Sequence, residues 1–155
     1  MKYWLVKSEP DVFSVDDLAN CPDQTRWWKH ERNYQARNFM RDDMHIGDRV
    51  FFYHSNTDVP AIVGVAEIAS EPYPDPDAFD PQAKYYDPKS DPENPRWFLV
   101  DIRLITKLDQ PISLRTIKEH GETLGDLPLI RKGNRLSVMP VASEQWDYIM
   151  SLKAA

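Results

Sequence analysis

The residues best suited to chemistry lie between residues 27 and 39, where the chain reads WWKHERNYQARNF. Its indole rings offer planar stacking faces, and its amide and guanidinium groups offer planar hydrogen-bonding edges. A flat ligand with a polar edge, such as a nucleobase, uses both kinds of group. The alternative is that Trp28 is a core residue while Arg32 and Arg37 are ordinary solvated charges, and composition alone does not separate the two.

Further polar and aromatic groups fall at the ends of predicted strands. Residues at strand ends can gather at one mouth of a small barrel, where ligands commonly bind. A serine at such a place can equally well be a turn or capping residue, so each serine taken alone leaves both roles open. The candidates at strand ends are Ser8, Tyr53, His54, Ser55, Trp97 and Ser137.

The elements that would position these residues are short. Alternating or apolar β-type runs predict five strands, and Ser14, Asn33, Ser113 and Ser143 each stand where a helix N-cap is expected. Gly64 predicts a bulge or a close approach of another group. The pattern indicates a barrel-like α+β domain. The predicted strands are 3–6, 49–55, 61–69, 98–106 and 136–139, and the predicted helices include 34–41 and 113–119.

Residues 71–95 are predicted to form a long irregular excursion, because seven of the 13 prolines fall there. At most one helical turn is expected within it, at 78–84. Loops of this length in a compact domain are usually functional or mobile. The segment holds seven acids and two lysines, a local net charge of −5 out of −6 for the whole chain.

The length of the chain limits the number of domains, and its net charge limits the kinds of nucleic-acid binding that are expected. A chain of 155 residues predicts one domain, 1–155, with a core of its own. A net charge of −6 and a pI of about 5.2 argue against a protein that coats phosphate backbones nonspecifically. They are compatible with a protein that holds one base in a pocket.

Several common chemistries lack their signatures. One cysteine, Cys21, excludes an internal disulfide and a cysteine-based zinc site. The four histidines do not pair at metal-ligand spacing, and there is no glycine-rich phosphate loop and no zinc deaminase motif. We therefore expect no metal and no cofactor. With neither a signal peptide nor a membrane-spanning run, we expect a cytoplasmic protein, or a nuclear one in a eukaryote.

Longer motifs connect these residues to a family. KSEP at 7–10, W at 28 with RNYQARN at 32–38, and FFYHS at 51–55 occur in this order, followed by YPD at 73–75, Trp97 with Val100-Asp101, and RLSVMP at 135–140. Together they closely resemble the EVE domain over essentially the whole chain. The EVE domain belongs to the PUA-like superfamily, akin to YTH and ASCH domains.

The resemblance implies a PUA-like small β-barrel of about five to six strands with peripheral short helices, and a pocket for a modified nucleobase. Relatives are associated with modified cytosines in DNA and, for YTH domains, with methylated adenine in RNA. Carried over to this chain, Trp28 and Trp97 are candidates for the aromatic walls, with Ser8, Tyr53, His54, Ser55 and Ser137 as further pocket residues. Pocket support or phosphate contact is expected from Lys7, Arg32, Asn33, Gln35 and Arg37.

The chain departs from the family pattern at His30-Glu31, where relatives often have a small pair like Gly-Val, and Trp27 adds an aromatic ring beside Trp28. A bulkier, acidic entry is expected to change which strand or base is admitted.

We expect a non-enzymatic, monomeric reader of modified DNA or RNA, possible bases being methylated or hydroxymethylated cytosine. One alternative is a hydrolase acting on a nucleotide or nucleic acid, with Lys7, Glu9, His54 and Asp101 converging in the same mouth. Another is a small-molecule or protein-interaction module that uses the acidic loop.

Overall fold

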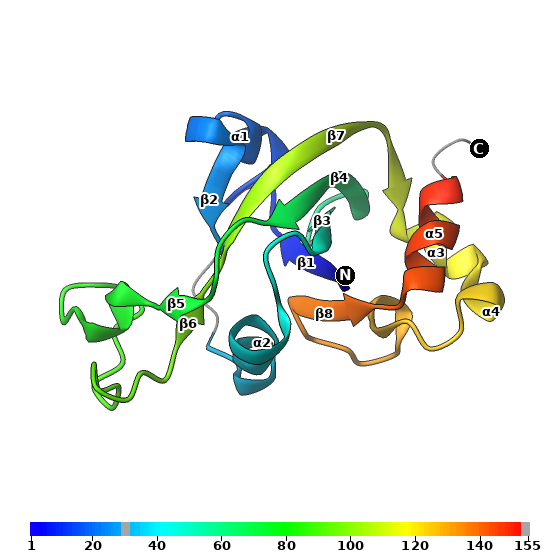
Figure 1. Cartoon of the computed structure of the whole chain (residues 1–155). Helices are drawn as coiled ribbons and strands as arrows, with labels where there is room; N and C mark the ends of the chain where they lie inside the picture. The colour runs from blue at the N-terminus through cyan, green and yellow to red at the C-terminus, as the bar shows by residue number, and fades with distance from the viewer. Residues whose placement is uncertain (29–31, 153–155) are drawn as a thin grey trace.

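The computed structural model describes residues 1–28 and 32–152 and shows an α+β fold built on a curled six-stranded sheet, a half-barrel (Figure 1). The strand order is β2-β7-β4-β3-β1-β8, and a separate two-stranded sheet pairs β5 with β6. The strands are β1 (Tyr3–Ser8), β2 (Thr25–Trp27), β3 (Arg49–His54), β4 (Ala61–Ile68), β5 (Tyr73–Pro74), β6 (Phe98–Leu99), β7 (Asp101–Ser113) and β8 (Val138–Val141).

The helices are short and lie around this sheet. The α-helices are α1 (Val15–Ala19), α2 (Tyr34–Asn38), α3 (Leu114–Glu119), α4 (Gly121–Leu124) and α5 (Ser143–Leu152). Helix α2 continues directly into a π-helical turn, Phe39–Asp43, and single 3-10 turns occur at Pro22–Gln24, Pro76–Phe79 and Pro128–Ile130. No helix of the described residues is long and apolar enough to cross a membrane.

Strands β1 and β3 run parallel, and this brings their carboxyl ends to one edge of the sheet. Ser8 of β1 lies opposite His54 of β3. Strand β8 pairs antiparallel with the other side of β1, so its beginning lies at the same edge. Three segments far apart in sequence therefore meet where β1 and β3 end.

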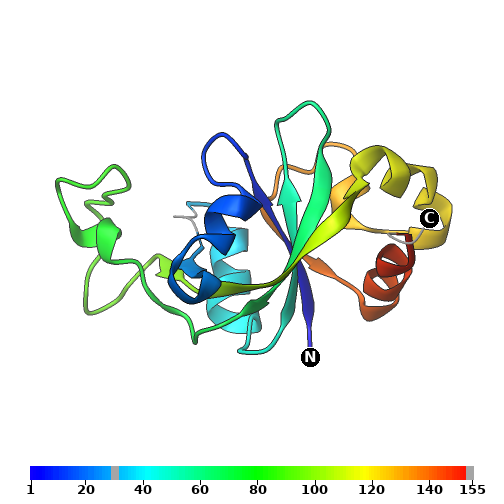
Figure 2. The same ribbon diagram turned by 90° about the horizontal axis from the view of Figure 1, so that it is seen from above.

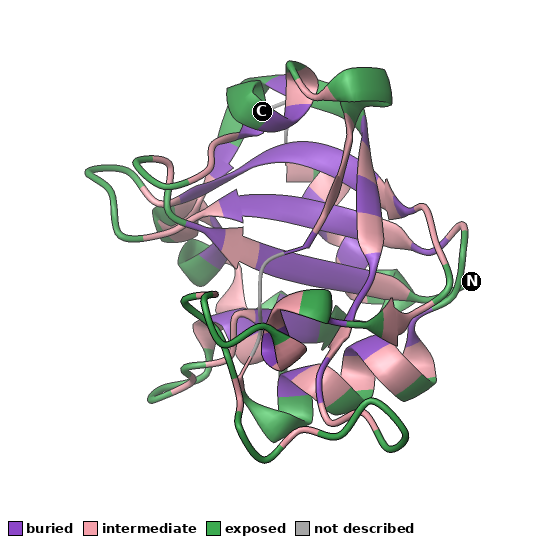
Figure 3. Ribbon diagram, turned by 90° about the vertical axis from the view of Figure 1, so that its left-hand side faces the viewer, coloured by how far each residue is buried: buried purple, intermediate pink, exposed green. Residues whose placement is uncertain are grey.

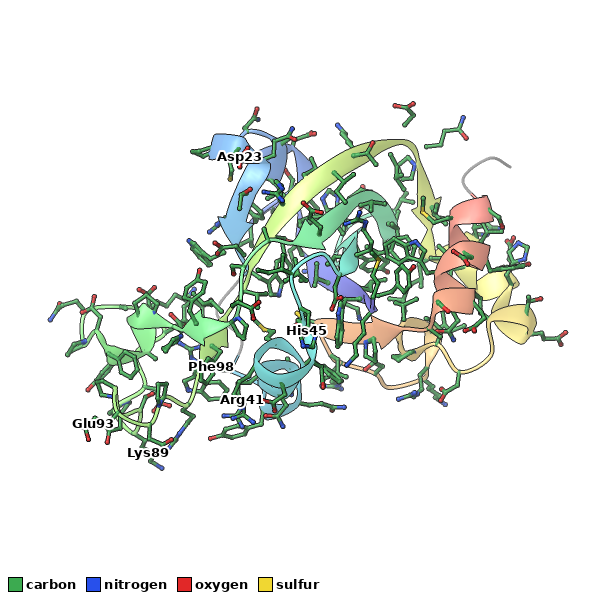
Figure 4. The ribbon with its side chains drawn as sticks, viewed as in Figure 1. Asp23, Arg41, His45, Lys89, Glu93 and Phe98 are labelled. Carbon is green, nitrogen blue, oxygen red and sulfur yellow. The ribbon has the colours of Figure 1, made fainter. Side chains whose placement is uncertain are left out.

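A buried carboxylate helps to hold this arrangement. Asp48, just before β3, accepts hydrogen bonds from the backbone N–H of Lys2 at 3.1 Å, from the indole Nε1 of Trp4 at 3.0 Å and from the N–H of His45 at 3.0 Å. The turn between α2 and β3, in which Figure 4 labels His45, is thus tied to the start of β1.

The curl of the sheet comes largely from β4 and β7, whose register shifts twice, once on either side of Gly64 and Val65. A Cβ atom at Gly64 would lie 3.0 Å from Cγ2 of Val15 and 3.2 Å from the carbonyl oxygen of Thr106. The predicted bulge and close approach at Gly64 are both confirmed. Strand β7 arches over the other strands in Figure 1.

Apolar side chains pack on both faces of the sheet, and the strands are buried along most of their length (Figure 3). Along β3 the side chains alternate, with Phe52 in the cluster that includes residues of α1 and α2, and Phe51 and Tyr53 in the cluster that includes residues of α3 and α5. Trp146 of α5 stacks on Phe51 with ring centroids 3.7 Å apart. Trp146 and Ile149, on one face of α5, are both buried in the core.

Several predicted boundaries were wrong. The strand predicted at 98–106 is interrupted at Val100, so β6 pairs with β5 while β7 joins the main sheet and continues to Ser113. The last strand begins at Val138, two residues later than predicted. Helix α4 and strand β2 were not among the predicted elements.

The segment between β4 and β7 projects from the body of the fold, as Figures 1 and 2 show. Lys89 and Glu93 lie at its far end in Figure 4. Its one helical turn is Pro76–Phe79, slightly earlier than predicted.

Candidate functional site

A cavity of about 530 Å³ opens where β1 and β3 end and β8 begins. This volume lies within the range of pockets that hold small ligands. Its lining comprises Lys7, Ser8, Glu9, Val12, Phe13, Arg26, Trp27, Trp28, Ser55, Lys84, Tyr85, Arg135, Leu136 and Ser137.

Backbone pairing sets the floor of the cavity. The N–H of Ser55 donates to the carbonyl of Ser8 at 3.0 Å, and the N–H of Lys7 donates to the carbonyl of Ser137 at 2.8 Å. The hydroxyl of the buried Ser8 donates to the carbonyl of Phe13. A hydroxyl that has donated its proton offers only lone pairs to a ligand, so Ser8 is an acceptor toward the cavity.

Strand β2 and the residue after it supply an aromatic wall. Its backbone pairs with β7, and the N–H of Trp28 continues this pairing by donating to the carbonyl of Val100 at 2.8 Å. Trp28 is only 2% exposed and meets the ring of Phe52 edge-on, with centroids 6.0 Å apart. The indole is therefore held in one orientation, which favours stacking without a further loss of side-chain freedom.

Cations outnumber acids in the lining. Among the described residues of the lining, four are Lys or Arg and one, Glu9, is acidic. Oε1 of Glu9 accepts a hydrogen bond from the side-chain amide of Asn56 at 3.1 Å. The cavity is thus positive in a chain whose net charge is −6. The four cations are Lys7, Arg26, Lys84 and Arg135.

The projecting segment contributes Lys84 and Tyr85 to the cavity. Arg32 holds it in place, because its guanidinium donates to Oδ2 of Asp75 at 3.0 Å and to the carbonyl of Tyr85 at 2.7 Å. The Asp75 side chain is fully buried, and its Oδ1 accepts from the N–H of Asp77 at 2.9 Å. The acidic excursion is therefore anchored at the point where it reaches the cavity.

Of the residues predicted for the pocket, the structure brings Ser8, Trp28, Ser55 and Ser137 together in the lining, along with Lys7. It does not bring Trp97 there. That indole stacks on Tyr34 with centroids 4.9 Å apart, and its Nε1 donates to Asp87 at 2.7 Å. Trp97 therefore does not form the second aromatic wall that was predicted for it.

Tyr53 and His54 also lie outside the lining. Tyr53 faces the other side of the sheet, where burial raises its pKa to about 12. His54 accepts a hydrogen bond at Nε2 from the N–H of Val15 at 3.0 Å, and burial lowers its pKa. The side chain therefore caps the start of α1.

The predicted supporting residues stabilise α2 and its surroundings. The Asn33 side chain caps α2 by accepting from the N–H of Ala36 at 3.0 Å, as predicted. Arg37 donates to the carbonyl of Arg96 at 2.7 Å, and burial lowers its pKa. Gln35 is exposed on α2.

The four residues of the hydrolase alternative do not converge in the described structure. Lys7 and Glu9 line the cavity, whereas His54 caps α1 and Asp101 accepts a hydrogen bond from the hydroxyl of Tyr73 at 2.7 Å. Burial of the phenol, together with its hydrogen bond to the Asp101 carboxylate, raises the pKa of Tyr73. The residues in 1–28 and 32–152 contain no group of three His, Cys, Asp or Glu side chains that could hold a metal ion.

The sequence motifs and the fold agree with one family model. The EVE domain model matches residues 2–152. The chain belongs to the EVE domain family. The resemblance that the motifs indicated is thereby confirmed.

Known proteins also match over nearly the whole chain. Thymocyte nuclear protein 1 of Gallus gallus is 40% identical, over 97% of this chain and 68% of its own length. The crystal structure of human THYN1 in complex with DNA containing 5-methylcytosine superposes with a TM-score of 0.91 at 38% identity, covering 100% of this chain and 99% of that one. A protein from Pseudomonas syringae gives a TM-score of 0.88 at 45% identity, with 97% and 99% covered.

Some lining residues of this EVE domain were not predicted. Trp27 was predicted only as an aromatic ring beside Trp28, and neither Arg26 nor Arg135 was a candidate site residue. Lys84 and Tyr85 lie in a segment whose length marked it as functional, although nothing singled out these two residues. The departure from the family pattern at His30-Glu31 falls outside the described residues.

Proposed function

We propose that this protein is a reader of modified DNA that takes a flipped base, a 5-modified cytosine, into the cavity beside Trp28. The observation that carries the proposal is the combination of a fixed indole wall with a positive lining in one cavity. The human relative solved with 5-methylcytosine-containing DNA has the same fold and supports this ligand class.

The energetics are compatible with base flipping. Extruding a base costs a few kcal/mol, and least for a base that is already unpaired. Stacking on an aromatic side chain is worth about 1–3 kcal/mol per base. Trp28 lines the cavity, and Trp27 and Tyr85, which are more exposed than Trp28, add aromatic area in the same lining. Stacking and edge hydrogen bonds together can offset the extrusion.

The hydrogen-bonding character of the cavity suits cytosine. Cytosine carries an exocyclic amine, which is a donor. The Ser8 hydroxyl donates its hydrogen bond to the carbonyl of Phe13, so its oxygen is available as an acceptor for such an amine. Since a thymine would place a carbonyl there instead, this contact would favour cytosine over thymine.

We propose that the protein binds its ligand without catalysing a reaction, in preference to the hydrolase alternative. His54, the histidine of the hydrolase alternative, already accepts a hydrogen bond from the N–H of Val15. Glu9 already accepts one from the side chain of Asn56. We propose a monomeric reader with DNA as its main ligand, and modified RNA is a second ligand to be measured in the same assay.

Fluorescence polarisation with labelled oligonucleotides tests the proposal. Matched strands would carry cytosine, 5-methylcytosine or 5-hydroxymethylcytosine at one position, in DNA and in RNA. The wild type should bind the 5-methylcytosine strand more tightly than the plain strand. Equal affinity for modified and plain strands would refute the proposal.

Two tryptophans provide a matched pair of variants. Trp28 and Trp97 are similarly buried, at 2% and 5% exposed, but only Trp28 lines the cavity. Trp28→Ala should reduce affinity for the modified strand roughly tenfold to a hundredfold, the worth of one stacking contact. Trp97→Ala should keep the ratio of modified to plain affinity, and circular dichroism would verify that both variants fold.

A further inference from the structure

One partly exposed arginine of the cavity packs against two aromatic rings. The guanidinium carbon of Arg26 lies 4.1 Å from the ring centroid of Phe13 and 4.1 Å from that of Trp27. Its N–H donors lie in the plane of the group and do not bond to the rings that pack against its central carbon, so they can still bind a ligand. Within the part of the chain that the structure describes, this guanidinium forms no hydrogen bond or ion pair with another side chain.

A planar fork of donors held in place by packing is suited to bidentate binding of phosphate or carboxylate. The neighbours of Arg26 favour an anion over a neutral acceptor, because Lys7, Lys84 and Arg135 share the same lining. Glu9 is the one acid in the part of the lining that the structure describes. The group that satisfies the Arg26 fork should therefore be negatively charged.

The distribution of charge over the whole chain limits the size of this anion. The chain has a net charge of −6, and residues 71–95, which reach the cavity at Lys84 and Tyr85, account for −5. Charges are screened over about 8 Å at physiological salt. A single phosphate inside the cavity is attracted by nearby cations, whereas a long phosphate backbone also runs past repelling acids.

We infer that Arg26 forms a phosphate subsite of the cavity, and that the protein consequently binds a free pyrimidine nucleoside monophosphate carrying the modified base, as well as the base within DNA. The inference rests on the proposed function, since it assumes that the base occupies the same cavity. The unit that the cavity recognises is then a nucleotide, with the base against Trp28 and the phosphate at Arg26.

Isothermal titration calorimetry tests this with 5-methyl-2′-deoxycytidine and its 5′- and 3′-monophosphates. At least one monophosphate should bind about tenfold more tightly than the nucleoside, as expected for charge-assisted hydrogen bonds. This gain should shrink as salt is added, because it depends on charge. The single-stranded oligonucleotide with one 5-methylcytosine serves as the reference ligand.

Two variants that remove one positive charge each make a matched pair. Arg26→Gln should abolish the difference between monophosphate and nucleoside. Arg115→Gln, on the exposed surface of α3 and outside the lining, should leave that difference unchanged. Arg26→Lys keeps the charge but loses the planar fork, so it should retain only part of the gain. Thermal unfolding of each variant checks that the fold is kept.

The outcomes separate this inference from the proposed function. If the modified oligonucleotide binds wild-type protein but neither monophosphate binds more tightly than the nucleoside, the phosphate subsite is refuted and the reader function stands. If the oligonucleotide, nucleoside and monophosphates all fail to bind, both are refuted. An equal loss of the monophosphate gain in Arg26→Gln and Arg115→Gln would also refute the subsite, because it would reduce the effect to net charge.

Discussion

Replacing Arg32 with alanine should both destabilise the fold and loosen one wall of the cavity. Arg32 joins the fully buried carboxylate of Asp75 to the backbone of Tyr85, at 3.0 Å and 2.7 Å. Without the guanidinium, the Asp75 charge stays buried with fewer donors around it. Tyr85 loses the hydrogen bond that holds its backbone at the cavity.

The magnitude follows from the burial of the two partners. Removing one partner of a buried ion pair costs about 3–5 kcal/mol. The Arg32 side chain is 25% exposed, so water can replace part of the lost interaction, and Oδ1 of Asp75 keeps its bond from Asp77. We therefore expect the free energy of unfolding to fall by about 2–3 kcal/mol.

Urea unfolding followed by tryptophan fluorescence measures this change. Arg41→Ala is the matched control, because Arg41, labelled in Figure 4, pairs with the exposed Asp42 next to it in sequence. That pair is open to solvent, so its loss should leave the free energy of unfolding almost unchanged. Equal effects of Arg32→Ala and Arg41→Ala would contradict the reasoning.

A double-mutant cycle with Asp75→Asn isolates the pair itself. If Arg32 acts through Asp75, the effects of the two single substitutions should not add, and a coupling energy of about 1 kcal/mol or more should remain. Additive effects would show that the destabilisation arises elsewhere. Affinity for modified DNA should fall in Arg32→Ala and stay near wild type in Arg41→Ala.

Three further predictions concern the sheet that carries the cavity. Gly64→Ala should destabilise the fold by about 1–3 kcal/mol, because the new methyl group would meet Val15 at 3.0 Å; unchanged urea unfolding would contradict the close packing. Asp48→Asn should cost about 3 kcal/mol, since an amide cannot accept all the donors around this buried group, and a thermal melt would measure it. Tyr53 has a folded pKa raised to about 12, so its contribution to stability should be present below pH 10 and lost between about pH 10 and 12. Tyr53→Phe should remove that part of the alkaline loss, as compared by urea unfolding across this range, and an identical pH profile in the variant would speak against it.

The parts of the fold that could be predicted from sequence are those specified by local chemistry. The Ser14 capping box forms as expected, with Ser14 and Asp17 each accepting from the other's N–H. Strands β1, β3 and β4 follow their apolar patterns to within two residues at each end. Strand β2 has only three residues and no alternation, so its pairing with β7 depends on contacts distant in sequence.

The candidate site shows the same division. Placing polar residues at strand ends correctly brought Ser8, Ser55 and Ser137 to one place, because parallel and antiparallel pairing fixes where strands end. The side of the sheet was harder to predict, since β3 has aromatic residues on both faces, and Tyr53 turned away from the cavity. No local pattern places Tyr85 at the cavity, because its position depends on Arg32.

The position of β1 between β3 and β8 has a consequence for the synthesis of the protein. Ser8 is paired across to His54, and Val6 to Val138, so β1 leaves the ribosome well before the two strands that pair with it have been made. Translation proceeds at about 5–20 residues per second, which makes this delay on the order of ten seconds. A nascent chain that ends before Ser137 lacks part of the cavity lining, so nucleotide binding would begin only after Ser137 has been synthesised.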